Sequence, residues 1–272
     1  MIRNMNKLAY LAKFLLYALS NPKEGKEVFR TKYQSMQDSS TSLYDYSSRQ
    51  KSLEETIAAL FPNSSITIQD AISNTKKLQN HISDFFDSIK SEKYPSKKKP
   101  YPTEYSIDDE SGLFLYILCI ETKPNHVVET GVAYGQSSMY VLQALKENKK
   151  GSLHSIDAVF SPWQTKKMIG VAIPSNLKDS WDFNFGSAAD KLNDILSSLG
   201  SVDIFLHDSL HTYKNMMFEF ETAWSYIASG GFLISDDIGD NNAFNDFCTK
   251  MKLDSIILKQ KTGSSLGIVK KP

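Results

Sequence analysis

The sequence is poor in cysteine and in net charge, and each shortage argues against a class of protein. The chain of 272 residues contains 2 cysteines. These two, Cys119 and Cys248, have no metal-type spacing and lie in apolar, helix-like surroundings, which is typical of reduced core thiols and predicts a cytoplasmic protein. The 31 basic and 31 acidic residues cancel, so no overall field favours nucleic acid, and we expect no nucleic-acid partner.

The sequence also lacks an apolar run long enough to cross a membrane. Its N-terminal run, residues 8–19, is interrupted by Lys13, although Arg3 and Lys7 precede it as in a signal peptide. The pattern instead predicts an amphipathic helix that packs on the protein itself or a sister subunit, or lies on a membrane surface. A homo-oligomer and a peripheral membrane contact through this helix therefore both remain open. The residues expected on one side are Leu8, Leu11, Leu15 and Leu19.

Residues 1–100 are expected to form a helical N-terminal extension, and residues 101–272 a separate α/β domain. Ser52 and Glu55 form a capping box for a short helix. A longer helix is expected to begin near Thr67, because apolar residues recur at three- and four-residue steps up to Ile89. The stretch from Lys90 to Pro102 is rich in proline and lysine, which predicts a linker.

Residues 126–138 read as a strand, a glycine turn and the start of a helix. In an open parallel sheet, such a turn binds ligands at the carboxyl ends of the strands. Ala133 stands where a dinucleotide fingerprint needs its second glycine, so a dinucleotide is disfavoured. A plain turn of a doubly wound fold is the alternative interpretation. The residues expected to bind a cofactor here are Glu129, Thr130, Gly131, Gly135, Ser137 and Ser138.

Strands and helices alternate beyond this turn, which predicts a doubly wound, mostly parallel, Rossmann-like α/β sheet. The second strand ends at Asp157. A carboxylate at that position accepts hydrogen bonds from the two vicinal hydroxyls of a ribose. We therefore expect Asp157 to bind the same cofactor.

Three acids, Asp208, Asp236 and Asp237, follow the fourth and fifth strands. Crowded carboxylates at neighbouring strand ends suit Mg²⁺ or another divalent cation, although capping of the following segments is the simpler interpretation. His211 follows Asp208 by three residues in a loop. An imidazole next to a metal-bound substrate is well placed as a general base, so His211 is the candidate catalytic residue.

These motifs resemble a known family. Glu129-x-Gly131-x-x-x-Gly135 is similar to the first motif of class I S-adenosylmethionine (SAM) methyltransferases. The stretches 208–213 (DSLHTY) and 230–237 (GGFLISDD) resemble the DxxHxY and GGxxxxDD signatures of macrocin and related sugar O-methyltransferases, a metal-dependent branch.

The resemblance implies a seven-stranded sheet that binds SAM, with a magnesium or other divalent metal site and a histidine base. It implies metal ligation by Asp208, Asp236 and Asp237, and proton abstraction by His211. It also implies cofactor contacts from Asp208 and, near adenine, from the turn that contains Ser187. Ser187 and Leu210 depart from the family, in which these positions are commonly acidic.

We therefore expect a SAM-dependent methyltransferase that modifies a hydroxyl of a small molecule or sugar. Three alternatives stay open. One is a metal-independent methyltransferase that acts on nitrogen or a carboxylate, and another is a non-catalytic assembly partner with the same fold. The third is an NAD oxidoreductase, against which Ala133 argues.

Overall fold

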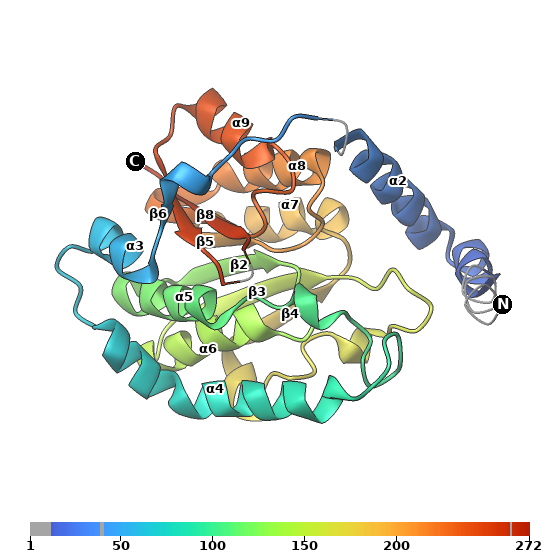
Figure 1. Ribbon diagram of the computed structural model, residues 1–272, viewed down its shortest axis with the longest axis horizontal. Coiled ribbons are helices and arrows are strands. Elements are labelled where there is room, and N and C mark those ends of the chain that lie inside the picture. The colour runs from blue at the N-terminus through green and yellow to red at the C-terminus, as the bar shows by residue number, and fades with distance from the viewer. Residues whose placement is uncertain (1–11, 39–40, 262) are drawn as a thin grey trace.

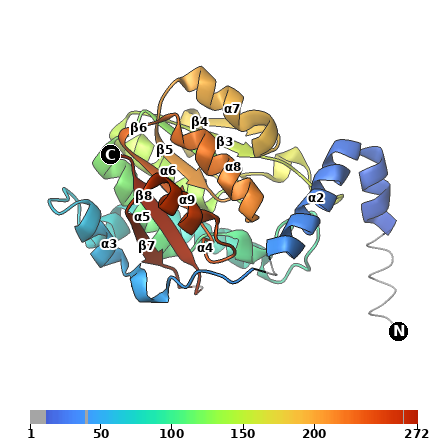
Figure 2. The same cartoon turned by 90° about the horizontal axis from the view of Figure 1, so that it is seen from above.

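The centre of the molecule is one sheet with helices on both faces (Figures 1 and 2). The computed structural model describes residues 12–38, 41–261 and 263–272, and within them the sheet has 8 strands. Their order across the sheet is β1 (Gln50–Lys51), β7 (Ser255–Lys259), β8 (Ser265–Lys270), β6 (Ile227–Ser235), β5 (Val202–His207), β2 (His126–Thr130), β3 (Ser152–Asp157) and β4 (Trp181–Phe185).

The strand directions confirm the predicted doubly wound, mostly parallel sheet. Strands β6, β5, β2, β3 and β4 are parallel to their neighbours in this group, and β8 is antiparallel to both β6 and β7. The eighth strand, β1, was not expected. Its Gln50 pairs with Ile257 of β7, and the Arg49 guanidinium donates to the Ser255 carbonyl at 3.1 Å. Two residues are too few to show a strand period in sequence.

The helices cover the two faces of the sheet with separate hydrophobic clusters. Figure 1 shows α4 to α6 on one side and α7 to α9 on the other. The first group comprises α4 (Ile68–Lys90), α5 (Asp109–Thr122) and α6 (Gln136–Asn148), joined by the shorter α3 (Leu53–Leu60). The second comprises α7 (Ala188–Leu199), α8 (Tyr213–Trp224) and α9 (Ala243–Met251).

Two helices of the N-terminal extension begin where the sequence predicts them; the capping box was predicted at Ser52, and the structure has another at Thr67. The Ser52 hydroxyl accepts from the Glu55 N–H at 3.2 Å, and the Thr67 hydroxyl accepts from the Asp70 N–H at 3.0 Å. Leu78 of α4 is buried in the same cluster as α5 and α6. The extension therefore packs on the sheet domain, and the division at residue 100 stays a prediction.

The first described part of the extension forms an arm that projects from one end of the molecule (Figure 2). Residues 12–20 are helical and lead into α2 (Pro22–Asp38). Of the predicted apolar face, Leu8 and Leu11 lie outside the described residues, whereas Leu15 and Leu19 are 48% and 79% exposed. Among the described residues, every helix is too short or too polar to cross a membrane.

The predicted linker lies against the strand-end loops. The Pro100 carbonyl accepts from the Trp163 indole N–H at 3.1 Å, and the Tyr101 carbonyl accepts from the Tyr134 hydroxyl at 2.8 Å. Trp163 belongs to the insertion between β3 and β4, and Tyr134 to the glycine turn. The linker, the insertion and the glycine turn are therefore packed together.

Candidate active site

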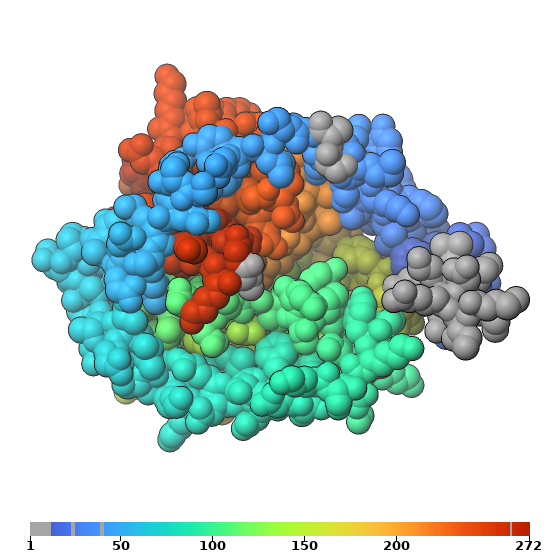
Figure 3. All heavy atoms as spheres, in the orientation of Figure 1, coloured from blue at the N-terminus to red at the C-terminus, as the bar shows by residue number. Residues whose placement is uncertain are grey.

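The loops after β2, β3, β5 and β6 meet at one rim, because parallel neighbouring strands end on the same side. Backbone hydrogen bonds join the loops in pairs. The Asp208 N–H donates to the Thr130 carbonyl at 2.8 Å, and the Asp236 N–H donates to the His207 carbonyl at 2.9 Å. Figure 3 shows a hollow bordered by the red C-terminal hairpin and the green segment near residue 105. The rim thus brings the glycine turn and the acidic residues together.

The glycine turn has a conformation that larger residues do not fit. Gly131 has φ +86°, and a Cβ atom there would lie 1.7 Å from the Asp208 carbonyl oxygen. Gly135 has φ +96°, and a Cβ atom there would lie 2.5 Å from Ile173. Both positions combine a left-handed backbone with a close approach, which glycine alone tolerates. The turn therefore lies in direct contact with the loop that carries Asp208.

Glu129 lies beneath this turn and is fully buried. Its carboxylate accepts from the hydroxyls of Ser155 at 2.6 Å, Ser137 at 3.2 Å and Ser138. Burial raises the pKa of Glu129 to about 7, although the serine hydrogen bonds oppose that rise. The three predicted residues Glu129, Ser137 and Ser138 are thus joined to one another, and their contact with a cofactor stays a prediction.

Asp157 lies at the end of β3, as predicted, and holds the glycine turn. One carboxylate oxygen accepts from the N–H groups of Val132 at 3.0 Å and Ala133 at 2.9 Å, and the other accepts from the Ala158 N–H at 2.6 Å. Burial raises the pKa of Asp157, and these N–H groups lower it. Binding of a ribose by Asp157 remains a prediction.

Ser187 lies at the beginning of α7. Its hydroxyl accepts from the Asp190 N–H at 3.2 Å and donates to the Asp190 carboxylate at 2.8 Å. Ser187 therefore caps this helix, and the contact with adenine that the resemblance implied stays a prediction.

A buried carboxylate that sequence analysis missed connects the turn to the histidine loop. Glu219 of α8 accepts from Thr130 at 2.5 Å, His207 at 2.7 Å, Ser209 at 2.7 Å and Asn215 at 2.8 Å. Burial raises its pKa, but His207 and these hydrogen bonds outweigh that effect and lower it. The sequence feature that could have indicated this buried carboxylate is an acid placed between Phe218 and Phe220 on an apolar helix.

The acids that follow β5 and β6 lie close together. Burial raises the pKa of Asp208 well above its usual range, and Asp236 and Asp237 raise it further. Burial and the Asp237 charge also raise the pKa of Asp236 to about 7. Within the protein, Asp236 accepts from Gln260 at 2.6 Å and Asp237 accepts from Ser264 at 2.5 Å. In this acidic corner, burial and the crowding of the carboxylates therefore favour the uptake of a proton or a cation.

His211 faces this corner. Its Nδ1 lies 3.4 Å from an Asp237 carboxylate oxygen, and its Nε2 lies 4.0 Å from an Asp208 oxygen. Nε2 is buried without a hydrogen-bond partner among the described residues. Burial and the neighbouring His207 lower the pKa of His211 to about 4. The imidazole is therefore neutral near pH 7, and its Nε2 has no protein partner among the described residues.

One group of side chains has the spacing of a cation site, and it includes an acid, Asp240, that sequence analysis missed. Among the described residues, ligand atoms of His211, Asp237 and Asp240 lie within 4.8 Å of one another. Carboxylate oxygens suit a hard cation, and His211 contributes one imidazole nitrogen to the same group. Asp240 follows Asp237 by three residues in the same loop. Asp208 and Asp236 lie beside this group, and metal ligation by the three predicted acids stays a prediction.

The insertion between β3 and β4 covers the glycine turn. The Gly170 N–H donates to the Ala133 carbonyl at 2.8 Å, and the Ala172 N–H donates to the Tyr134 carbonyl at 3.1 Å. The Ala172 carbonyl lies 2.8 Å from Nε2 of His81 on α4. The insertion therefore contacts the glycine turn directly, and α4 of the N-terminal extension contacts the insertion.

Comparison with known proteins agrees with this arrangement. Residues 128–238 match a family model described as a methyltransferase domain. This match spans the glycine turn, Asp157 and the whole acidic corner up to Asp237. No curated protein sequence matches the chain.

Solved structures with low sequence identity have the same fold. An O-methyltransferase from Bacillus cereus in complex with S-adenosylhomocysteine (SAH) is 16% identical with a TM-score of 0.52, covering 80% of this chain and 97% of its own. A SAH-bound methyltransferase from Podospora anserina is 12% identical with a TM-score of 0.53, covering 85% and 99%. A methyltransferase from Geobacter sulfurreducens is 15% identical with a TM-score of 0.52, covering 71% and 89%. The chain thus has the Rossmann-like fold of methyltransferases, preceded by N-terminal helices.

Proposed function

We propose that this chain, whose residues 128–238 form a methyltransferase domain, transfers the methyl group of SAM to a hydroxyl oxygen of a small molecule. The observation that carries the proposal is the contact between Gly131 and the Asp208 carbonyl, which joins the glycine turn to the acid and histidine corner. A cofactor over the turn and an acceptor beside His211 are then neighbours. Direct transfer needs that proximity, because a sulfonium methyl requires little activation beyond positioning.

SAM is the cofactor that the turn supports best. The B. cereus and P. anserina structures contain SAH, the demethylated form of SAM. In this chain, the residue at the dinucleotide glycine position is Ala133, which has φ +46° and a Cβ atom that crowds a pyrophosphate. SAM has no phosphate, so this crowding does not count against it.

A divalent cation such as Mg²⁺ fits the acidic corner. Asp237, grouped with Asp240 and His211, would hold it together with the adjacent Asp208 and Asp236. When bound, such an ion lowers the pKa of an acceptor hydroxyl. The crowding that raises the pKa of Asp208 is the physical reason to expect a cation there.

His211 is proposed as the general base. Its neutral ring has a buried, unpartnered Nε2, and its Nδ1 lies near Asp237. An acceptor hydroxyl that donates to Nε2 would give up its proton there as the oxygen attacks the methyl carbon, the carbon–sulfur bond of SAM breaks and SAH leaves. The resemblance to macrocin-type enzymes makes a sugar hydroxyl the first acceptor class to test.

The first experiment is a calorimetric titration of the protein with SAM and with NAD, with and without Mg²⁺. We expect SAM and no NAD to bind, and labelled SAM to transfer its methyl group to a member of a panel of sugar and phenolic hydroxyl compounds. Binding of NAD instead of SAM would favour an oxidoreductase. SAM binding with transfer to amines or carboxylates alone would reassign the acceptor.

A substitution tests the base. His211→Ala is expected to lower kcat by about 10²- to 10⁴-fold, the usual contribution of general base catalysis, with SAM affinity unchanged. His154→Ala is the matched control, because His154 lies within β3, away from the rim, and bonds Asp182 at 3.0 Å. Wild-type turnover in the His211→Ala protein would remove this residue from the mechanism.

A metal-independent reaction is the second candidate, and one observation favours it. Gln260 and Ser264 already donate to Asp236 and Asp237, so these carboxylates have protein partners without an ion. Full activity after exhaustive chelation would establish this alternative, whereas loss of activity that Mg²⁺ restores would support the cation.

A further inference from the structure

The N-terminal arm, defined here as residues 12–38, concentrates exposed apolar surface. It carries 6 of the 15 exposed large hydrophobic side chains among the described residues. On its first helix these are Leu15, Leu16 and Leu19, which are 48%, 65% and 79% exposed. On α2 they are Phe29, Tyr33 and Met36, which are 62–65% exposed. Such a concentration on one projecting element is typical of an interaction surface.

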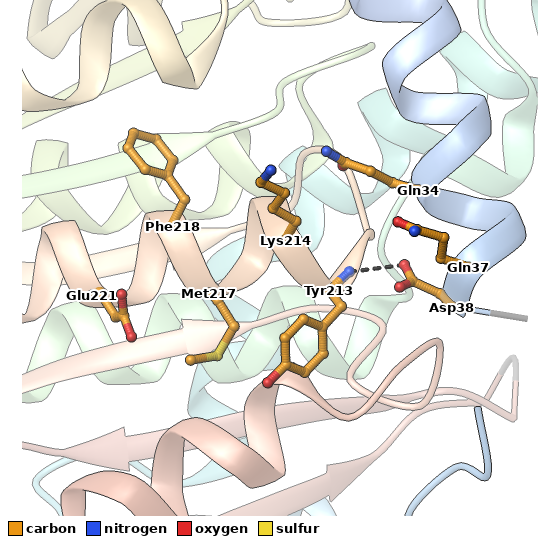
Figure 4. Close-up of a pocket in the computed structure, with 8 residues that line it drawn as sticks. All are labelled: Gln34, Gln37, Asp38, Tyr213, Lys214, Met217, Phe218 and Glu221. Atoms are coloured by element: carbon orange, nitrogen blue, oxygen red, sulfur yellow. Dashed lines mark hydrogen bonds between the residues drawn. The ribbon is translucent and has the colours of Figure 1, made fainter. Parts of the chain in front are cut away.

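A groove lies beside the arm, between α2 and the first turns of α8 (Figure 4). It encloses about 530 Å³. Its walls are fixed, because Asp38 accepts from the Tyr213 N–H at 2.9 Å and Gln34 accepts from the Thr212 hydroxyl at 2.8 Å. Two more of the exposed large hydrophobic side chains, Tyr213 and Phe218, line it at 36% and 38% exposure. The groove is therefore preformed and partly apolar.

The chain's own first helix does not fill this groove. The Tyr17 hydroxyl donates to the Val159 carbonyl at 3.2 Å, and Ala18 lies against Gly25 near the start of α2. From Pro22 to Gln34, α2 rises about 18 Å at about 1.5 Å per residue. The apolar face at Leu19 is thus held at one end of α2, and the groove lies at the other.

Charge favours contact between the arm of one copy and the body of another. The arm, residues 12–38, contains 5 basic and 3 acidic residues, a net charge of +2, whereas residues 39–272 contain 24 basic and 28 acidic residues, a net charge of −4. Two arms repel each other, whereas an arm and a body attract. The groove walls carry two acidic groups, Asp38 and Glu221, and one basic group, Lys214, so they have a net negative charge.

We propose that the protein forms a two-fold homodimer in which the helix of residues 12–20 of each copy occupies the groove between α2 and α8 of the other. Each chain carries both the helix of residues 12–20 and the groove, so a two-fold dimer contains two identical helix-to-groove contacts. The proposal does not depend on the proposed function.

Sedimentation velocity of the full chain over a wide concentration range tests the association. We expect a dimer whose dissociation constant rises at least about tenfold, equivalent to about 1.4 kcal/mol, in Leu19→Glu and in Phe218→Glu. The control Met251→Glu places the same charge at a 39% exposed position at the end of α9 and should not change it. Circular dichroism checks that the variants fold. A wild-type monomer at every concentration, or variants that still dimerise normally, would overturn the proposal.

Cysteine crosslinking tests which surfaces meet. A Leu19→Cys chain mixed with a tagged Phe218→Cys chain should form a disulfide between the two variants under diamide, and neither variant should crosslink alone. The native Cys119 and Cys248 are buried, which keeps the background low. Crosslinks between two Leu19→Cys chains would indicate that the arms pair with each other and would contradict the proposed dimer. Binding of a monomer to phosphatidylglycerol vesicles that Leu19→Glu abolishes would assign the arm to a membrane instead.

Discussion

The two halves of the strand-end rim treat their carboxylates differently. In the half formed by β2 and β3, Glu129 faces serine hydroxyls and Asp157 faces backbone N–H groups. In the half formed by β5 and β6, Asp208, Asp236 and Asp237 face one another and have few donors. In the first half, the protein itself supplies the hydrogen-bond donors that Glu129 and Asp157 need. In the second half, the carboxylates raise one another's pKa, and a bound cation would relieve this crowding, so the two halves should respond differently to mutation, pH and metal.

The largest expected effect comes from the point where the halves touch. Gly131→Ala places a Cβ atom 1.7 Å from the Asp208 carbonyl oxygen, so we expect loss of SAM binding and a clear fall in the unfolding temperature. Gly230→Ala is the matched control, because Gly230 also has a positive φ, +81°, but nothing lies within 4 Å of its Cβ position. The control should cost only about 1–2 kcal/mol. Equal effects of both substitutions would show that backbone strain, and not the contact, matters.

Metal binding should depend on the acidic half alone. Asp237→Asn removes a charge from the group formed with His211 and Asp240, so Mn²⁺ or Mg²⁺ should bind at least about tenfold more weakly in a calorimetric titration. Asp254→Asn, an exposed acid before β7, serves as the control. If Asp237→Asn leaves the affinity unchanged, the acids of this half do not form a metal site.

The glycine-turn half should produce a pH dependence that metal does not remove. Glu129 has its pKa raised from 4.5 to about 7 by burial, so the folded form holds the proton more tightly than the unfolded form. The resulting stabilisation is complete below about pH 4.5 and is lost as the pH rises through 7, by at most on the order of 3 kcal/mol.

Glu129→Gln carries no titrating proton, so its unfolding temperature should fall less than that of the wild type between pH 4.5 and 8. Glu54→Gln, on the exposed surface of α3, is the control. Both curves are measured with and without Mg²⁺. An unchanged slope in Glu129→Gln would mean that another group causes the loss of stability.

The smallest effect is expected at the edge of the acidic half. Ser264→Ala removes the hydrogen bond to Asp237, which should cost about 1 kcal/mol in free energy of unfolding without metal. With a saturating divalent cation the cost should shrink, because the ion replaces the lost donor. A cost that is the same with and without metal would contradict the idea that the ion and Ser264 share this carboxylate.

Local signals in the sequence predicted the elements that local chemistry determines. The capping residues Ser52 and Thr67 mark helix starts in the structure, and the glycine turn lies between a buried strand and a helix. The parallel order then places Asp157, Asp208 and Asp236 at one rim, since strand ends in such a sheet lie on the same side.

Contacts between distant residues escaped prediction. The pairing of Gln50 with Ile257 joins positions about 200 residues apart and involves a strand of 2 residues. The partners of Asp157 are N–H groups that every residue except proline carries, so no residue type signals them. Asp240 belongs to the acidic corner only because its loop bends back towards His211, and a single acid in a loop carries no such information.

The Glu219 carboxylate has a consequence for communication through the molecule. It accepts hydrogen bonds from Thr130 of β2, His207 of β5 and Ser209 of the loop before α8, while the exposed side of its own helix forms a wall of the groove beside α2. A shift of α8 would therefore be transmitted to both halves of the rim through one buried anchor. A change at the groove surface of α8 could therefore alter the rim through the hydrogen bonds of Glu219.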